Sequence, residues 1–117
     1  MNGDDRAAIK HWEKQQRAER RDLERLIEWY FGPSDSRMAK WVAWNVSHME
    51  PLAFHRNGGA GVGLFQIDPA DAVIDAGEGW LLHNPIRNVA AAHRIHAKHG
   101  WGYWSVPPLT PAFEETE

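Results

Sequence analysis

The feature of this sequence that most constrains its fold is a long stretch without helix breakers, at residues 4–31. It contains no proline and no glycine, and residues of high helix propensity dominate it. Its second half carries apolar residues at helical spacing, namely Leu23, Leu26, Ile27, Tyr30 and Phe31. The stretch therefore predicts one long helix, and a chain that is mainly α-helical.

The first half of this stretch has only a thin apolar edge. Between residues 4 and 19 the large apolar residues are Ile9 and Trp12, and charges of both signs alternate around them. Two interpretations remain open, a solvated helix or an arm whose thin edge binds another chain. The predicted partners are therefore other protein chains, contacted through this N-terminal helix.

The remaining sequence predicts short elements separated by turn signals. The string "GPSDS" at residues 32–36 ends the first helix and caps a second, predicted from about Arg37 to Met49. The string "VGLFQI" at residues 62–67 follows a glycine-rich loop and predicts a short strand in a β-hairpin. Cap and stop residues predict two further helices, with starts at Asp68-Pro69 and Asn84-Pro85 and stops at Gly77 and Gly100.

Three segments follow from this pattern. Residues 1–31 form a charged N-terminal helix or arm, residues 32–106 a small domain, and residues 107–117 a proline-rich acidic tail. The whole chain has 117 residues, which suffices for one small domain with a core. The tail is expected to be an ordered strap at first and a loose end after that.

Composition excludes several classes of protein. The formal net charge of −3 argues against a general nucleic-acid binder, which needs a basic face. The absence of cysteine excludes disulfides and thiolate metal sites. No apolar run approaches the roughly 20 residues of a membrane span, and the polar N-terminus lacks the apolar region of a signal peptide. We therefore expect synthesis in the cytoplasm, no membrane partner and no cofactor.

Three short strings resemble, in their order and spacing, the lytic transglycosylase and goose-type lysozyme family. They are "GLFQI" at residues 63–67, "NPIRNVAAA" at residues 84–92, and Gly100, Trp101 and Trp104 of "GWGYW". The resemblance covers about residues 38–104 and implies a lysozyme-like α+β fold. It also implies a peptidoglycan-binding cleft whose substrate contacts are Gln66, Phe65, Asn88, Trp101 and Trp104.

The catalytic acid of that family has no counterpart at its expected place. The family's acid is a glutamate that precedes a serine near the end of the second helix, followed by a P-x-A motif. Ser47, Pro51 and Ala53 match these landmarks, so Val46 stands at the glutamate position. The resemblance implies a mechanism in which this one carboxyl protonates the glycosidic oxygen, unlike that of two-carboxylate glycosidases. A valine there predicts that most activity is lost.

Glu50 is the candidate catalytic residue if activity remains. It lies four positions after Val46, about one helical turn or roughly 5.4 Å further along the axis. An acid must lie within about 3 Å of the oxygen that it protonates, so this shift is not harmless. Glu50 also precedes Pro51, where the helix ends and water has access.

Three histidines recur at every third position of the last predicted helix, as His93, His96 and His99. The first and third lie about 120° apart around the helix axis. No nearby carboxylate completes a zinc site, so no metal is predicted, and the histidines are assigned to the polar helix surface and the cleft edge.

Three functions are compatible with these observations. The preferred one is a degenerate, catalytically inactive lysozyme-like domain that serves as a structural or binding component, as in a bacteriophage tail or capsid. The second is an active peptidoglycan-cleaving enzyme that uses Glu50. The third is a module that binds peptidoglycan without cleaving it, through Gln66 and the aromatic residues. Val46 favours the first.

Overall fold

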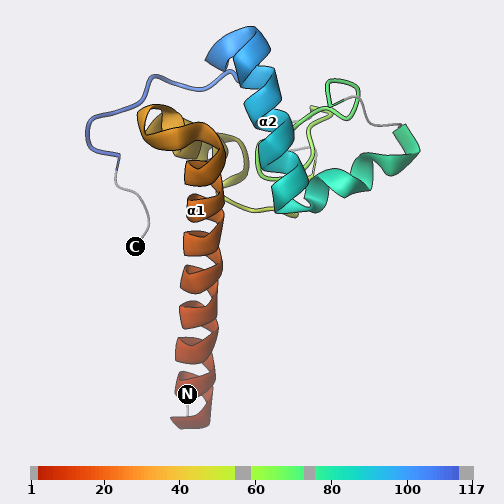
Figure 1. The fold of residues 1–117 in the computed structure, drawn as a ribbon. Coiled ribbons are helices and arrows are strands. Elements are labelled where there is room, and N and C mark those ends of the chain that lie inside the picture. Colours follow the sequence, from red (N-terminus) through yellow and green to blue (C-terminus); the bar gives the residue numbers. More distant parts are fainter. Residues whose placement is uncertain (1–2, 55–58, 73–75, 114–117) are drawn as a thin grey trace.

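The computed structural model describes residues 3–54, 59–72 and 76–113, without the side chains of residues 3–5, 12, 16 and 76–78. Two α-helices dominate it, α1 (Gly3–Ser47) and α2 (Pro85–His99). Two 3₁₀ helices flank α2, at Ala76–His83 and at Gly100–Tyr103. The elements form a compact body from which the N-terminal part of α1 projects (Figure 1).

A sharp bend divides α1 into two segments at Gly32. The backbone of Gly32 has φ 73° and ψ 176°, which lies outside the helical region. Glycine adopts this positive φ at little cost, and Pro33 then opens the second segment with its fixed helical φ. The string "GPSDS" thus ends the first segment as predicted, although the second segment begins at once.

The second segment of α1 folds back onto the first. Lys40 Nζ, which is buried, lies 2.5 Å from Glu28 Oε1. Nearer the open end, the guanidinium of Arg20 stacks over the ring of Trp44 at 5.5 Å. Since residue 20 meets residue 44 and residue 28 meets residue 40, the two segments run antiparallel as a helical hairpin.

The hydrophobic core lies between this hairpin, α2 and the loop at residues 62–67. Because this loop is buried almost throughout, we call it the core loop. The largest fully buried apolar side chains are Ile27 and Val42 of α1, Leu64, Phe65 and Ile67 of the core loop, and Leu82 and Val89 beside and within α2.

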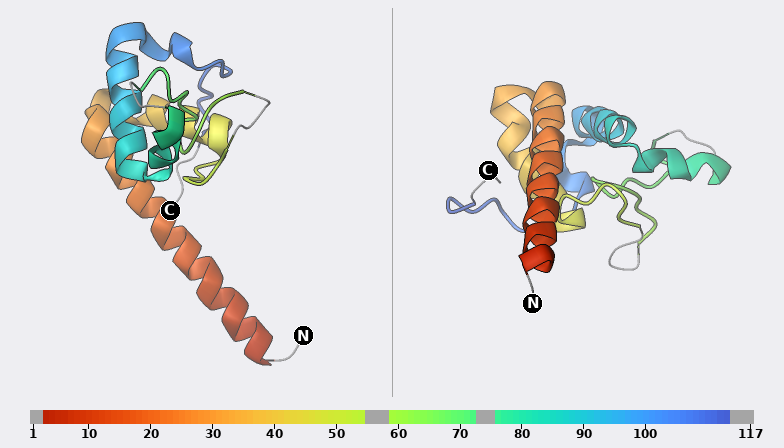
Figure 2. Two further views of the ribbon diagram at one scale, coloured as in Figure 1. Left: turned by 90° about the vertical axis from the view of Figure 1, so that its right-hand side faces the viewer. Right: turned by 90° about the horizontal axis from the view of Figure 1, so that it is seen from below.

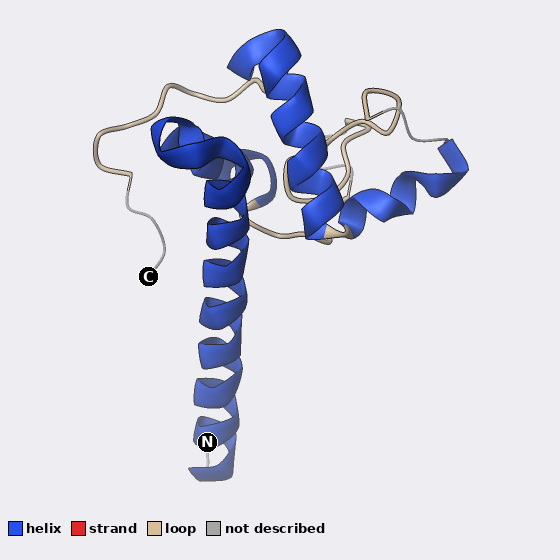
Figure 3. Cartoon of the chain, in the orientation of Figure 1, coloured by secondary structure: helices blue, strands red, loops and turns tan. Residues whose placement is uncertain are grey.

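The predicted β-hairpin is not formed, and the α+β prediction is wrong. In the described residues, β-pairing is limited to isolated bridges that join Phe54 to Val62 and Val62 to Ile67, and Figure 3 draws no strand. The core loop instead closes on itself, because Val62 and Ile67 exchange two backbone hydrogen bonds of 3.0 Å. Gly63 and Gln66 turn the chain with φ of 80° and 48°, which an extended strand does not allow.

The prediction for α2 is confirmed. The Asn84 side chain accepts hydrogen bonds from the amides of Ile86 and Arg87, Pro85 opens the helix, and Gly100 ends it with φ 69°.

The helix predicted to start at Asp68 is not formed in the described residues. The Asp68 carboxylate accepts the amide of Ala70 at 3.0 Å, but the chain through residue 72 is a turn. Residues 73–75 lie outside the described part of the chain.

The first part of the tail crosses the second segment of α1. Trp41 Nε1 donates a hydrogen bond of 2.8 Å to the carbonyl of Pro107. Arg37 donates to the carbonyls of Pro111 and Phe113 at 3.2 and 3.3 Å. The Phe113 ring meets the Trp41 ring edge-on at 5.0 Å. This part of the tail is therefore an ordered strap, and residues 114–117 lie outside the described part.

Within residues 3–54, 59–72 and 76–113, no helix combines the length and the apolar character that a membrane crossing requires.

Candidate functional site

Asn88 of α2 binds the core loop through its whole side-chain amide. Its Oδ1 accepts the amide of Phe65 at 2.8 Å. Its Nδ2 donates to the carbonyls of Val62 and Leu82 at 2.8 and 2.9 Å. Asn88 is fully buried, so these bonds satisfy backbone groups that no water reaches. Asn88 thus makes the backbone hydrogen bonds that a neighbouring strand would make if the core loop were part of a sheet.

Two further side chains complete this binding of the core loop. Ser47, at the end of α1, donates a hydrogen bond of 2.6 Å to the carbonyl of Leu64. Trp104, after the last 3₁₀ helix, donates from Nε1 to the carbonyl of Phe65 at 2.8 Å. The three strings that carry the family resemblance therefore meet in one place. Asn88 and Trp104 hold the backbone of the core loop by hydrogen bonds inside the core.

Most of the predicted glycan contacts lie in this core. Phe65, Asn88 and Trp104 are buried. Trp101 is half-buried and stacks on Phe31, with ring centroids 5.5 Å apart and planes 24° apart. A sugar stacks on an exposed ring face, and the rings of Phe65 and Trp104 offer little of one.

Gln66 is the predicted contact that borders a cleft. Its Nε2 donates to the carbonyl of Gly63 at 2.9 Å. The cleft has a volume of about 480 Å³ and is also lined by Gly59, Asp68, Asp71 and Tyr103. Neither Val46 nor Glu50 is among the residues that line it.

Val46 and Glu50 occupy different surroundings. Val46 is half-buried and packs against the hydrophobic core. Glu50 is exposed and follows two residues of positive φ, His48 at 54° and Met49 at 60°. Its carboxylate accepts the amide of Leu52 at 3.2 Å. The helix has thus ended before Glu50, so its side chain is not simply one helical turn beyond Val46.

Glu50 lines a second hollow, of about 380 Å³, at the open end of the α1 hairpin. Glu19, Arg20 and Leu23 contribute from the first segment, and Leu52 and Pro85 from the other side. Gln66 does not line this hollow. The candidate acid and the candidate sugar contact therefore belong to separate hollows.

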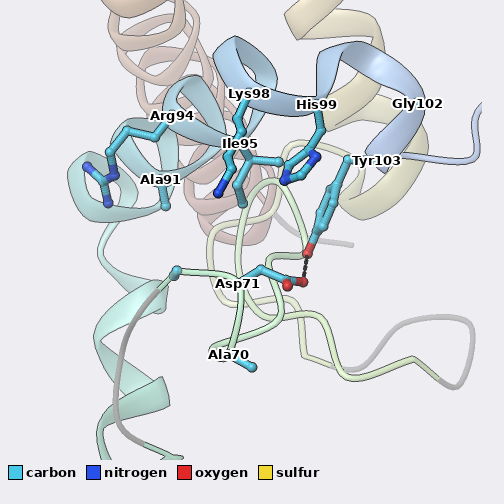
Figure 4. Close-up of a pocket in the computed structure, with 10 residues that line it drawn as sticks. Ala70, Asp71, Ala91, Arg94, Ile95, Lys98, His99, Gly102 and Tyr103 are labelled. Atoms are coloured by element: carbon cyan, nitrogen blue, oxygen red, sulfur yellow. Dashed lines mark hydrogen bonds between the residues drawn. The ribbon is translucent and has the colours of Figure 1, made fainter.

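A third hollow, of about 770 Å³, lies between α2 and the turn at residues 70–72 (Figure 4). Arg94, Lys98 and His99 border it from α2, Tyr103 from the 3₁₀ helix that follows α2, and Asp71 from the facing turn. The Tyr103 hydroxyl donates to Asp71 Oδ2 at 2.7 Å and accepts the amide of Asp68 at 3.3 Å. Burial, together with the hydrogen bond to the Asp71 carboxylate, raises the pKa of Tyr103 to about 12.

The residues of this third hollow were not predicted as a site. Arg94 and Lys98 stand four positions apart, which places them on one helix face. That signal was available in the sequence. The facing residue Asp71 comes from a distant turn, and no sequence spacing connects it with α2.

The histidines of α2 pack against aromatic rings. The rings of His93 and His96 lie 5.3 and 5.8 Å from that of Phe31, and His96 lies 3.9 Å from Trp101. In the described part of the chain, no three histidine or carboxylate side chains are grouped so that they could hold a metal ion.

No protein-family model, no curated protein and no solved structure matches this chain at a significant level.

Proposed function

We propose that this chain is a catalytically inactive, lysozyme-like domain that serves as a structural or binding component of a larger assembly. It binds another protein chain through the N-terminal part of α1. The assembly that we propose is a bacteriophage tail or capsid, because small lysozyme-like domains commonly serve in such particles.

The free part of α1 is the observation that carries this proposal. The second segment of the hairpin contacts the first as far as Arg20, and Glu19 borders the hollow at its end. Residues 3–19, which we call the arm, therefore extend beyond it, and every described side chain from Arg6 to Glu19 is exposed. At about 1.5 Å per residue the arm is roughly 25 Å long, and it stands clear of the body in the left-hand view of Figure 2.

Most helical stability in proteins comes from packing of an apolar face, and the exposed side chains of the arm gain little of it within this chain. The arm exposes Ile9, while the side chain of Trp12 lies outside the described part. A second chain that covers this edge would supply the packing that the chain itself does not provide.

The surroundings of Val46 and Glu50 support the absence of catalysis. A general acid must lie within about 3 Å of the glycosidic oxygen, directly or through one water. Valine offers no proton at position 46. Glu50 borders a hollow that Gln66 does not reach, so a sugar bound against Gln66 would not place its glycosidic bond beside this carboxyl.

We expect the purified protein to release no soluble muropeptides from peptidoglycan above the level of a Glu50→Ala variant. Chromatography of the soluble fraction measures this, with an active lysozyme as the positive control. Release that the Glu50→Ala substitution abolishes would show that the chain is an enzyme and would end the proposal.

We expect amide hydrogen exchange in the isolated protein to be fast in the arm and slow at residues 23–31. The described side chains of the arm are exposed, whereas Leu23, Ile27 and Phe31 are buried. Deletion of residues 1–18 is expected to change the free energy of unfolding by less than about 1 kcal/mol. Equal protection of both regions, in a sample that light scattering shows to be monomeric, would contradict a free arm.

A further inference from the structure

The hollow between α2 and the turn at residues 70–72 has one basic wall. Arg94, Lys98 and His99 contribute it from the last two turns of α2. In Figure 4 the Lys98 and His99 side chains point from the helix toward the turn that carries Asp71. Within the described residues, none of the three forms an ion pair or a side-chain hydrogen bond. Their donors are therefore available to a ligand.

The facing wall carries hydrogen-bond acceptors. Asp71 Oδ2 accepts the Tyr103 hydroxyl at 2.7 Å, which holds the carboxylate toward the hollow (Figure 4). A carboxylate has about four lone-pair positions, so Asp71 can accept a further hydroxyl or amide hydrogen. Between the two walls lie the buried side chains of Ala72, Ala91 and Ile95.

Positive charge at the end of a helix is not sufficient to identify a site. Cations in a last turn also interact favourably with the helix dipole, and that explanation would account for Lys98 on any helix surface. It does not account for a hollow of about 770 Å³ that also presents a carboxylate fixed by a tyrosine. The combination of cations, acceptor and apolar floor is what distinguishes this surface.

We propose that this hollow binds a small ligand that carries an oxyanion, phosphate or carboxylate, on a hydroxyl-bearing body such as a sugar. Lys98 binds the oxyanion by a charge-assisted hydrogen bond, His99 donates a second hydrogen bond, and Arg94 adds positive charge at the border of the hollow. Asp71 accepts hydrogen bonds from the hydroxyls, and the apolar face of the ring lies over Ala91 and Ile95. This site is independent of the arm and of any activity at Val46 or Glu50.

The test is a titration of the full chain with four probes, in which binding is monitored by amide chemical shifts in two-dimensional NMR. The probes are glucose 6-phosphate, glucuronate, inorganic phosphate and glucose. We expect saturable shifts at Ala91, Ile95 and Gly102 with at least one of the two charged sugars, and the tighter of these identifies the oxyanion. Inorganic phosphate should bind about tenfold more weakly than a bound sugar phosphate. Failure of both charged sugars, or equal binding of glucose, would overturn the proposal.

Two sets of variants locate the site. Lys98→Gln is expected to weaken binding of the charged sugar about tenfold, and Arg94→Gln to weaken it less. Arg87→Gln, which changes an exposed arginine of α2 outside the hollow, is expected to leave binding unchanged. Asp71→Asn is expected to increase the affinity for inorganic phosphate. It is also expected to reduce the ratio of the affinity for the sugar phosphate to that for inorganic phosphate. The midpoint of thermal unfolding confirms that each variant is folded. If Arg87→Gln weakens binding as much as Lys98→Gln, the attraction is unspecific and the site is refuted.

Discussion

An Asn88→Ala substitution is expected to reduce the free energy of unfolding by about 4 kcal/mol, because it leaves three buried backbone groups without partners. The amide of Phe65 and the carbonyls of Val62 and Leu82 each bond to this one side chain. An unsatisfied buried group costs about 1–3 kcal/mol, and whole domains are stable by only about 5–15 kcal/mol. A large fraction of the molecules would unfold on mild heating.

Denaturation in urea measures this effect, with Asn45→Ala as the control. The Asn45 side chain is half-buried and donates a single hydrogen bond of 2.8 Å to the carbonyl of Trp41, one helical turn earlier. Its loss is expected to cost about 1 kcal/mol or less. Similar costs for the two variants would mean that the core loop keeps its shape without Asn88.

Gly63→Ala is expected to be as disruptive as the loss of Asn88, for a different reason. A Cβ at position 63 would lie 2.3 Å from Asn88 Nδ2 and 2.3 Å from the carbonyl oxygen of Leu82. The Leu82 oxygen belongs to the backbone, so the methyl group must displace the core loop itself. The backbone of Gly63 also has φ 80°, which adds about 1–2 kcal/mol for a residue with a Cβ. We expect a total loss above about 3 kcal/mol.

Gly100→Ala separates the two contributions. Gly100 has φ 69° and no atom within 4 Å of its added Cβ, so this variant carries the backbone strain without the steric clash. It is expected to cost about 1–2 kcal/mol. Should Gly63→Ala and Gly100→Ala unfold at the same urea concentration, the close approach of Asn88 to the core loop would be relaxed in solution.

Local sequence signals predicted α1 and α2, whereas the helix predicted from Asp68 is a turn through residue 72. Asn84, Pro85 and Gly100 define the ends of α2 because capping depends on neighbouring residues only. The apolar residues Leu23, Ile27 and Phe31 are buried as their helical spacing predicts. The interruption at Gly32 was also predicted, since glycine followed by proline interrupts a helix whatever surrounds it, but the second segment begins at Pro33 and not at about Arg37.

The core loop shows where local signals fail. Its apolar run at residues 62–67 is typical of a buried strand, and every one of its apolar side chains is indeed buried. Burial alone does not decide between a strand and a turn. Here the decision came from Ser47, Asn88 and Trp104, which satisfy its backbone groups from distant positions in the sequence.

The candidate sites were foreseen only in part, for the same reason. Gln66 was predicted and borders a cleft, whereas Phe65 and Trp104 were predicted as contacts and lie in the core. The pairing of Asp71 with Tyr103 joins residues 32 positions apart. Such a pairing depends on the tertiary fold, which residue spacing does not reveal.

The continuity of α1 has a mechanical consequence. The arm and the buried residues Leu23 and Ile27 belong to one uninterrupted helix up to Gly32. A pull on the arm therefore reaches the core as tension along the helix axis. The contacts across the hairpin, from Arg20–Trp44 to Glu28–Lys40, follow one another along that axis. These contacts are loaded in shear at the same time and do not open one after another. Such an arrangement suits a domain that is anchored by its arm in an assembly under force.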